Sequence, residues 1–215
     1  MVDRRVFPQT LPTRRQILEH FRERDPKMAQ VIQEVGPFRL KRNRKYFVVL
    51  CRSIVSQQIS TRAADTIYIR FRKLFDGKAP TPQRVAGLPE DTLRAAGLSR
   101  QKAAYLKDLG RRFLDGTLRP RQLNYLDNEA VIGQLTQVHG IGRWTAEMFL
   151  IFSLNRLDVL PVGDLGLLAA VQKIYGMKTR PDAKRVRALG EKWSPYETIA
   201  TWYGWRSLNA DIVNY

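Results

Sequence analysis

The 215-residue chain is predicted to be an all-α protein, and three observations support this fold class. Ser, Thr or Asp recurs just before segments whose apolar residues lie three or four positions apart, which is typical of helix starts. Gly or Pro follows many of these segments and ends them. No segment alternates apolar and polar residues long enough to indicate a strand. About ten short helices joined by short loops are therefore expected.

The first two helices are predicted from their N-terminal signals. Thr13 and Gln16 have the spacing of a capping box, in which each side chain bonds the backbone of the other residue. Asp25 and Pro26 match an N-cap followed by the first helical residue. Gly36-Pro37 then ends the second helix, because proline cannot continue the hydrogen-bond pattern.

The segment from Tyr46 to Gln58 is apolar over most of its length, so it is predicted to be a buried central helix. Start and end signals predict the later helices, over Thr61–Phe75, Thr81–Gly87, Asp91–Gly97, Ser99–Gly116, a segment that follows Asp127, Leu165–Tyr175, Pro181–Gly190 and Ser194–Ser207. No linker rich in Pro, Gly and Ser divides the chain, so one domain over residues 1–215 is expected.

The charge of the chain indicates the class of its partner. Thirty-seven Lys and Arg residues against 20 Asp and Glu residues give a net charge of +17. Such an excess attracts polyanions and supplies the electrostatic part of nucleic-acid binding. A structural role of the ribosomal kind and a merely soluble basic surface are the alternatives. The basic cluster Lys41–Lys45 fits either a solvated linker or a phosphate contact.

The single cysteine limits the possible cofactors and compartments. Cys51 lies in an apolar run, and one cysteine can form neither an intrachain disulfide nor a zinc or iron–sulfur site. Core packing is therefore expected for Cys51. No segment is long and apolar enough to span a bilayer, and the start of the chain lacks the apolar region of a signal peptide. An intracellular protein is expected, cytoplasmic or nucleoid-associated in a bacterium, without a membrane partner.

The most informative stretch runs from Leu135 to Ala170. It contains a tight turn with two glycines, Gly140 and Gly142, and then a single acidic residue, Asp164. Glycines allow backbone N–H groups to approach a phosphate closely. An ordinary helical hairpin turn is the alternative, and Asp158 is the acidic competitor of Asp164.

These residues resemble the helix-hairpin-helix DNA glycosylase superfamily, and within it the 3-methyladenine DNA glycosylase II branch. The hairpin motif reads Gly140-Ile141-Gly142-Arg143-Trp144-Thr145-Ala146-Glu147, and Leu160–Asp164 matches the loop that carries the family's aspartate. Further matches lie at Ser53–Ser60, Ala96–Lys102 and Trp193–Tyr196, so the resemblance covers about residues 40 to 210. The chain departs from the family at Glu197-Thr198, where Arg-Ser is usual.

The resemblance implies a fold of two helical lobes with a cleft between them and no N-terminal β domain. Lobe A is expected over about residues 42–142, ending in the hairpin, and lobe B over about 1–41 together with 143–215. The expected partner is double-stranded DNA that contains alkylated bases, bound by a monomer. No catalytic cofactor and no iron–sulfur cluster are expected.

The resemblance also assigns the chemistry to two residues. Asp164 would stabilise the positive charge that develops on the sugar when the N-glycosidic bond breaks, or orient the attacking water. Asp164 also fits an N-cap for the helix that starts at Leu165, and both roles are compatible. Trp144 stands where bifunctional members carry a nucleophilic lysine, so the enzyme is expected to lack AP lyase activity.

An alkylated purine carries positive charge, which aromatic faces attract by cation–π contact. The resemblance places Trp144 and Trp205 around the flipped base and Asp164, with Met148 and Tyr203 as weaker candidates. Core packing is the alternative for these side chains.

The remaining candidates concern the DNA backbone. Gln58 would fill the gap left by the flipped base, with Gln57 as its rival. The other candidate DNA contacts are Ser99, Lys102, Gly140, Gly142, Arg143 and Thr145. The resemblance adds that the hairpin carbonyls, here those of Thr136, Val138 and Ile141, commonly bind a monovalent cation such as Na⁺ or K⁺.

The sequence thus predicts a monofunctional glycosylase that removes alkylated bases such as 3-methyladenine and starts base excision repair. Two other functions stay open: a glycosylase of the same fold for a deaminated base or ethenoadenine, and a hairpin DNA-binding protein without catalysis.

Overall fold

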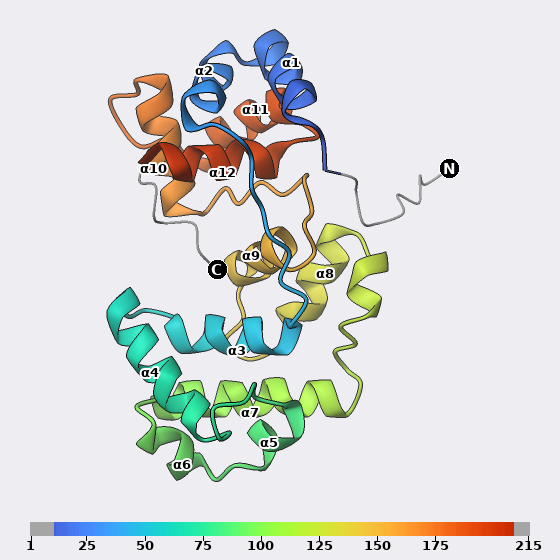
Figure 1. Ribbon diagram of the computed structural model, residues 1–215, viewed down its shortest axis with the longest axis vertical. Helices are drawn as coiled ribbons and strands as arrows, with labels where there is room; N and C mark the ends of the chain where they lie inside the picture. The colour runs from blue at the N-terminus through green and yellow to red at the C-terminus, as the bar shows by residue number, and fades with distance from the viewer. Residues whose placement is uncertain (1–10, 209–215) are drawn as a thin grey trace. The chain divides into compact units, whose positions relative to one another are not determined.

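The computed structural model describes residues 11–208, and every regular element in that range is helical (Figure 1). The all-α prediction is therefore confirmed. The chain divides into two compact units, which are described separately. Within the described residues, unit 1 consists of residues 11–42 and 150–208, and unit 2 of residues 43–149.

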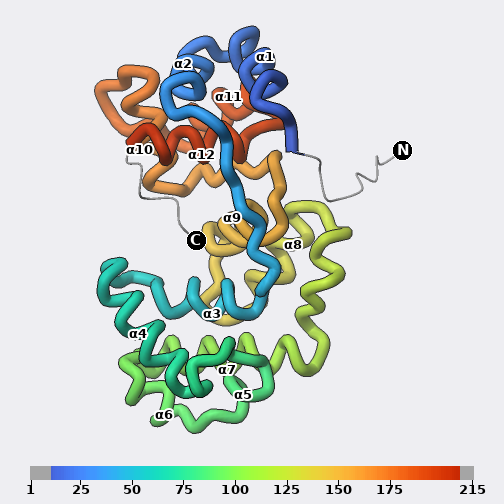
Figure 2. The backbone as a smooth tube through the Cα atoms, in the orientation of Figure 1, coloured from blue at the N-terminus to red at the C-terminus, as the bar shows by residue number. Residues whose placement is uncertain are grey.

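Unit 1 is organised around its last helix. Its elements are α1 (Arg14–Arg24), α2 (Pro26–Val35), the end of α9 (Arg143–Phe152), α10 (Leu165–Tyr175), α11 (Ala183–Trp193) and α12 (Glu197–Leu208). Residues Thr198 to Trp205 of α12 are all buried, and α12 packs against α2, α10 and α11. The tube in Figure 2 shows α2, from the start of the chain, beside α12, from its end.

A buried carboxylate joins three helices of unit 1. Asp25 caps α2 and accepts the backbone N–H of Met28 through Oδ1 at 3.2 Å. Its Oδ2 accepts the indole N–H of Trp193 on α11 at 2.9 Å and the hydroxyl of Tyr175 on α10. Asp25 is only 4% exposed, so these donors replace the water that the charge loses on folding.

Unit 2 is built on a pair of helices that run in opposite directions. Its elements are α3 (Tyr46–Ser56), α4 (Thr61–Lys73), α5 (Pro82–Gly87), α6 (Glu90–Ala95), α7 (Arg100–Leu114), the 3-10 helix η1 (Gln122–Tyr125), α8 (Asn128–Leu135) and most of α9. Phe47 near the start of α3 contacts Phe113 near the end of α7, with ring centroids 5.0 Å apart. Lys102 at the start of α7 reaches the carbonyls of Val55 and Gln57 at the end of α3. Cys51 on α3 is fully buried, which confirms its packing role, and burial raises the pKa of its thiol.

The predicted helix starts agree well with the structure. The N-caps of six helices accept a backbone N–H from the third helical residue: Thr13, Asp25, Ser60, Thr81, Ser99 and Asp127. The helix expected from Asp91 instead begins at Glu90, after Pro89. None of the helices between residues 11 and 208 is long and apolar enough to cross a membrane.

The limits of several helices differ from the predicted ones. α3 ends at Ser56, two residues before the predicted end, because Gln58 has a left-handed φ of 55°. α11 begins at Ala183 rather than Pro181, since Asp182 is its N-cap. α12 begins at Glu197 rather than Ser194.

Candidate functional site

Asp164 is the N-cap of α10, and its side chain is held by two donors. Its Oδ1 accepts the backbone N–H of Leu167 at 2.6 Å and the indole N–H of Trp205 at 2.7 Å. The capping role expected from the sequence is therefore confirmed. The residue is 7% exposed, and the N-terminal end of α10 stabilises a negative charge at this position.

The indole of Trp205 is itself fixed by packing. It stacks on Phe152, with ring centroids 5.9 Å apart and an interplanar angle of 14°. A Cβ atom at position 166 would lie 3.0 Å from the Trp205 ring and 3.1 Å from Asp164 Oδ1, so Gly166 leaves room for their contact. Unit 1 therefore presents a carboxylate whose orientation is set before any substrate binds.

The hairpin between α8 and α9 lies in unit 2 and has a tightly constrained backbone. Gly140 has φ +83°, and a Cβ atom there would lie 2.0 Å from the ring of Tyr105 on α7. Only glycine fits that position. Gln57 Nε2 donates to the carbonyl of Gly140 at 2.7 Å, which ties the hairpin to the end of α3.

A second contact holds the hairpin and was not anticipated from the sequence. Asp108 Oδ2 on α7 accepts the backbone N–H of His139 at 2.9 Å and lies 2.9 Å from His139 Nδ1. Arg112 Nε donates to the same oxygen at 3.1 Å. Although burial opposes it, hydrogen bonds from His139 and Arg112 hold the pKa of Asp108 below its ordinary value. Residues 108 and 139 are 31 positions apart, so no local pattern could reveal the pair.

The residues that follow the hairpin glycines differ in exposure. Arg143 forms a two-pronged ion pair with Glu129, and its Nε donates to Glu147 Oε1 at 3.1 Å. The hydrogen bond to Glu129 is the main cause that raises the pKa of Arg143. Trp144 is 42% exposed, whereas Thr145 is buried.

The two candidate glutamines in the loop after α3 have different surroundings. The Gln57 side chain is engaged with the hairpin, whereas Gln58 is exposed on its left-handed turn. Lys102 Nζ donates to the carbonyls of Val55 and Gln57 at 2.8 Å each, and burial lowers its pKa. Ser99 caps α7 through Lys102 N at 3.2 Å. Unit 2 thus brings together the loop of Gln57 and Gln58, the start of α7 and the hairpin.

Two weaker candidates are core residues. Met148 on α9 is buried, and Tyr203 on α12 is fully buried with its hydroxyl donating to the carbonyl of Gly36 at 2.8 Å. Burial raises the pKa of Tyr203 to about 12. Both side chains therefore have packing roles, whatever else they contact.

The hairpin carbonyls were the candidates for a monovalent cation. Val138 O accepts the N–H of Ile141 at 3.0 Å, and the Thr136 hydroxyl turns back to Ile132 O at 2.8 Å. A carbonyl oxygen has two lone pairs, so the Ile141 N–H bond still leaves one lone pair on Val138 O. Among residues 11–208 no group of three or more His, Cys, Asp or Glu residues could hold a metal ion.

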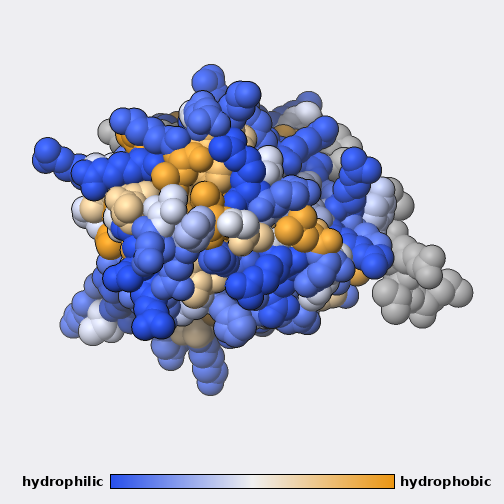
Figure 3. Space-filling model, turned by 90° about the horizontal axis from the view of Figure 1, so that it is seen from below, coloured by the Kyte–Doolittle hydropathy of each residue, from blue (hydrophilic) through white to orange (hydrophobic). Residues whose placement is uncertain are grey.

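Some exposed apolar side chains adjoin the candidates in the sequence. The face in Figure 3 is mostly hydrophilic, with smaller apolar patches between the polar atoms. Leu165, next to Asp164, and Ile59, next to Gln58, are exposed although large and apolar. Sequence reasoning missed both, because each falls within a predicted helix or turn without a distinguishing pattern.

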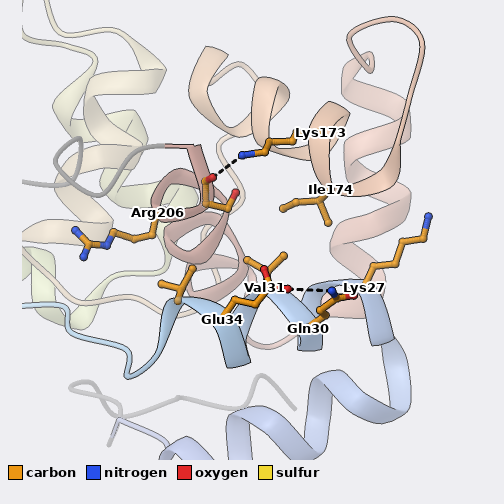
Figure 4. A pocket seen from close by; sticks show the side chains of 9 residues that line it. Lys27, Gln30, Val31, Glu34, Lys173, Ile174 and Arg206 are labelled. Carbon is orange, nitrogen blue, oxygen red and sulfur yellow. Dashed lines mark hydrogen bonds between the residues drawn. The ribbon is translucent and has the colours of Figure 1, made fainter.

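Two pockets lie away from all these residues. One of about 580 Å³ opens between α2, α10 and α12 of unit 1 (Figure 4). Its lining is mixed, and Lys173 Nζ donates to Ser207 O at 2.8 Å there. The other, of about 600 Å³, lies in unit 2 beside Phe47 and Phe113.

Comparison with known proteins gives the same family throughout. The model of the family described as "HhH-GPD superfamily base excision DNA repair protein" matches residues 51–195. DNA-3-methyladenine glycosylase 1 of Schizosaccharomyces pombe is 33% identical over 193 residues, which cover 87% of this chain and 85% of that protein.

Solved structures agree with the sequence comparison. The crystal structure of a DNA-3-methyladenine glycosidase from Bacillus halodurans has a TM-score of 0.81 at 36% identity, covering 89% of this chain and 88% of that one. The S. pombe 3-methyladenine DNA glycosylase in complex with abasic DNA has a TM-score of 0.80 at 33% identity, covering 93% and 100%.

Proposed function

Because the chain belongs to the HhH-GPD superfamily of base excision DNA repair proteins, we propose that it is a DNA glycosylase for alkylated bases such as 3-methyladenine in double-stranded DNA. The observation that carries this proposal is the fixed carboxylate of Asp164, held by the Trp205 indole and the start of α10. The relatives described above are named for the same lesion.

The reaction is hydrolysis of the bond between the sugar C1′ and the base nitrogen. An N-alkylated purine is cationic, so it leaves with the bonding electron pair as a neutral base and needs no general acid. Positive charge develops on the sugar, and the Asp164 carboxylate stabilises it. Water then adds to C1′ and loses its proton, which leaves an abasic site. No cofactor enters these steps.

The hairpin is the proposed grip on the DNA backbone. The backbone N–H groups of Gly140 and Gly142 can approach a phosphate without side chains in the way, and this contact reads no sequence. The carbonyls of Thr136, Val138 and Ile141 would hold a Na⁺ or K⁺ ion, which would add positive charge beside the phosphate. Arg143, Thr145, Ser99 and Lys102 are proposed as supporting contacts.

Gln58 is the proposed residue that fills the gap after base flipping, since its side chain is exposed while Gln57 binds Gly140. Trp144 and Trp205 are the proposed aromatic contacts of the flipped base, and Met148 and Tyr203 are weaker candidates. The exposure of Trp144, at 42%, supports a stacking contact.

The enzyme is proposed to be monofunctional and to act as a monomer. Strand cleavage by a glycosylase needs an amine that forms a Schiff base with the sugar. Trp144 occupies the position at which the bifunctional relatives carry that lysine, and an indole cannot form this adduct.

Base release tests the proposal directly. Wild type should release 3-methyladenine from methylated duplex DNA, and Asp164→Asn should lose activity by about 100-fold or more. Failure of wild type to release this base, together with release of ethenoadenine or a deaminated base, would reassign the substrate. Equal activity of Asp164→Asn would remove the carboxylate from the mechanism. Borohydride trapping should give no covalent DNA adduct, and an adduct would contradict monofunctional action.

A further inference from the structure

We propose that Gln57 and Lys102 are positioning residues that hold Gln58 ready to fill the gap left by the flipped base, at a fixed place relative to the hairpin. This inference rests on the proposed roles of Gln58 and of the hairpin. The Gln58 side chain and the backbone grip would then act as one preorganised unit instead of two independent contacts with DNA.

The backbone of Gln58 needs support from its surroundings. Gln58 has φ 55°, a left-handed conformation that is unfavourable for a residue with a Cβ atom. Such a conformation persists where neighbouring contacts hold it, and it is commonly found at functional sites. Because the Gln58 side chain is exposed, this support comes mainly from the residues on either side of it.

Gln57 is held through both its side chain and its backbone. Its Nε2 donates to Gly140 O at 2.7 Å, and Lys102 Nζ donates to Gln57 O at 2.8 Å. The same ammonium donates to Val55 O at 2.8 Å, at the end of α3, where helical carbonyls lose their backbone donors. The residue directly before Gln58 is therefore fixed at two points.

The residues after Gln58 are fixed by the next helix. Ser60 caps α4, since its hydroxyl accepts the N–H of Ala63 at 3.3 Å and its carbonyl accepts the N–H of Ala64 at 2.9 Å. Only Gln58 and Ile59 thus lie between two anchored residues, and both of their side chains are exposed. Such a short span has few conformations to lose when DNA binds.

The hairpin and this loop are both seated on α7. Lys102 binds the loop, and the ring of Tyr105 packs so closely against Gly140 that a Cβ atom there would lie 2.0 Å from it. Positions 102 and 105 are three residues apart, so they share one face of α7. Gln57 joins the loop to the hairpin by its bond to Gly140 O. A phosphate bound at the hairpin would therefore also set the position of Gln58.

A direct role of Gln57 in filling the gap is the alternative, and the contacts favour Gln58. The Gln57 side chain would have to break its bond to Gly140 O before it could enter the duplex. That would leave a backbone acceptor without its donor, which costs free energy. The Gln58 side chain is already exposed and breaks no such bond.

The test is a double-mutant cycle on single-turnover release of 3-methyladenine from methylated duplex DNA. Gln57→Met removes the donor to Gly140 O with little change in size, so release should slow by about tenfold through misplacement of Gln58. In a Gln58→Ala background the same change should slow release by less than about twofold, because Gln57 then has no side chain to position. A merely structural role of Gln57 would slow release equally in both backgrounds.

Lys102→Met gives a second measurement of the same coupling. It removes the bonds to Val55 O and Gln57 O, so it should slow release more in wild type than in the Gln58→Ala background. Lys107→Met is the matched control, since Lys107 Nζ on α7 donates to Leu88 O at 2.8 Å, away from the loop. This control should leave the release rate unchanged in both backgrounds.

The outcomes separate the inference from the proposed function. A Gln57→Met enzyme as fast as wild type, or one slowed equally in both backgrounds, would overturn the positioning role while leaving the proposed function intact. A Gln58→Ala enzyme as fast as wild type would overturn both the positioning role and the proposed role of Gln58. Failure of wild type to release the base would instead contradict the proposed function itself.

Discussion

Asp25 and Asp164 are two buried aspartates of unit 1 that make similar local hydrogen bonds. Each caps a helix, and each accepts an indole N–H, from Trp193 and Trp205 respectively. At Asp25 the donors come to both oxygens and include the Tyr175 hydroxyl. At Asp164 the backbone and indole bonds both end on Oδ1.

The two carboxylates differ in role: Asp25 joins three helices, whereas a chemical role is proposed for Asp164. Asp25 accepts hydrogen bonds from donors on three helices, so its carboxylate stabilises the packing of those helices. Asp164 accepts the Leu167 and Trp205 hydrogen bonds through Oδ1, and Gly166 leaves room for the Trp205 ring beside that oxygen. A carboxylate held in a fixed orientation suits the proposed role of Asp164 as an electrostatic catalyst.

The largest expected contrast comes from the same substitution at both positions. Asp25→Asn should lower the free energy of unfolding by on the order of 3 kcal/mol, because an amide nitrogen would face the hydroxyl and indole donors. Asp164→Asn should cost roughly 1 kcal/mol or less, since Asn is also a good N-cap. Chemical denaturation measures both losses of stability. The rate of base release should show the opposite order, with the larger loss in Asp164→Asn. Equal losses of stability would break the distinction between the two sites.

Replacing the indoles gives a smaller contrast of the same kind. Trp205→Phe keeps an aromatic ring against Phe152 but removes the donor to Asp164, so activity should fall roughly 10- to 100-fold through misplacement of the carboxylate. Trp193→Phe should leave single-turnover base release unchanged and lower the stability by about 1–3 kcal/mol. A Trp205→Phe enzyme as active as wild type would show that the indole bond does not position Asp164.

The smallest effect is expected two residues after each aspartate. Gly166→Ala would place a Cβ atom 3.0 Å from the Trp205 ring, so the ring must shift by a few tenths of an ångström. Activity should fall by less than about tenfold, with little change in stability. Lys27 lies at the equivalent position, two residues after Asp25. Lys27→Ala should leave the rate of base release unchanged. Single-turnover rates of both variants measure the difference.

The sequence was sufficient for features that depend on neighbouring residues. The N-caps at Thr13, Asp25, Ser99 and Asp164 follow from side chains that reach only three residues along the chain. Helix ends were harder to predict. At the end of α3, Gln58 adopts a left-handed backbone conformation without being a glycine, so the sequence carries no clear end signal.

Contacts between distant residues could not be read in this way. Trp205 and Asp164 are 41 positions apart, and Gln57 and Gly140 are 83 apart. Periodicity shows which face of a helix is buried, but not which indole N–H meets which carboxylate. The pairing of His139 with Asp108 was missed for the same reason.

The N-cap of α10 also constrains how this protein could be engineered. Removal of a catalytic group often stabilises an enzyme, because active sites commonly trade stability for activity. Here Asp164 also binds the first turn of α10 and the indole of α12, so deleting its side chain forfeits structural bonds along with the charge. Screens that select for stability alone should therefore keep a capping side chain, Asp or Asn, in place at the start of α10.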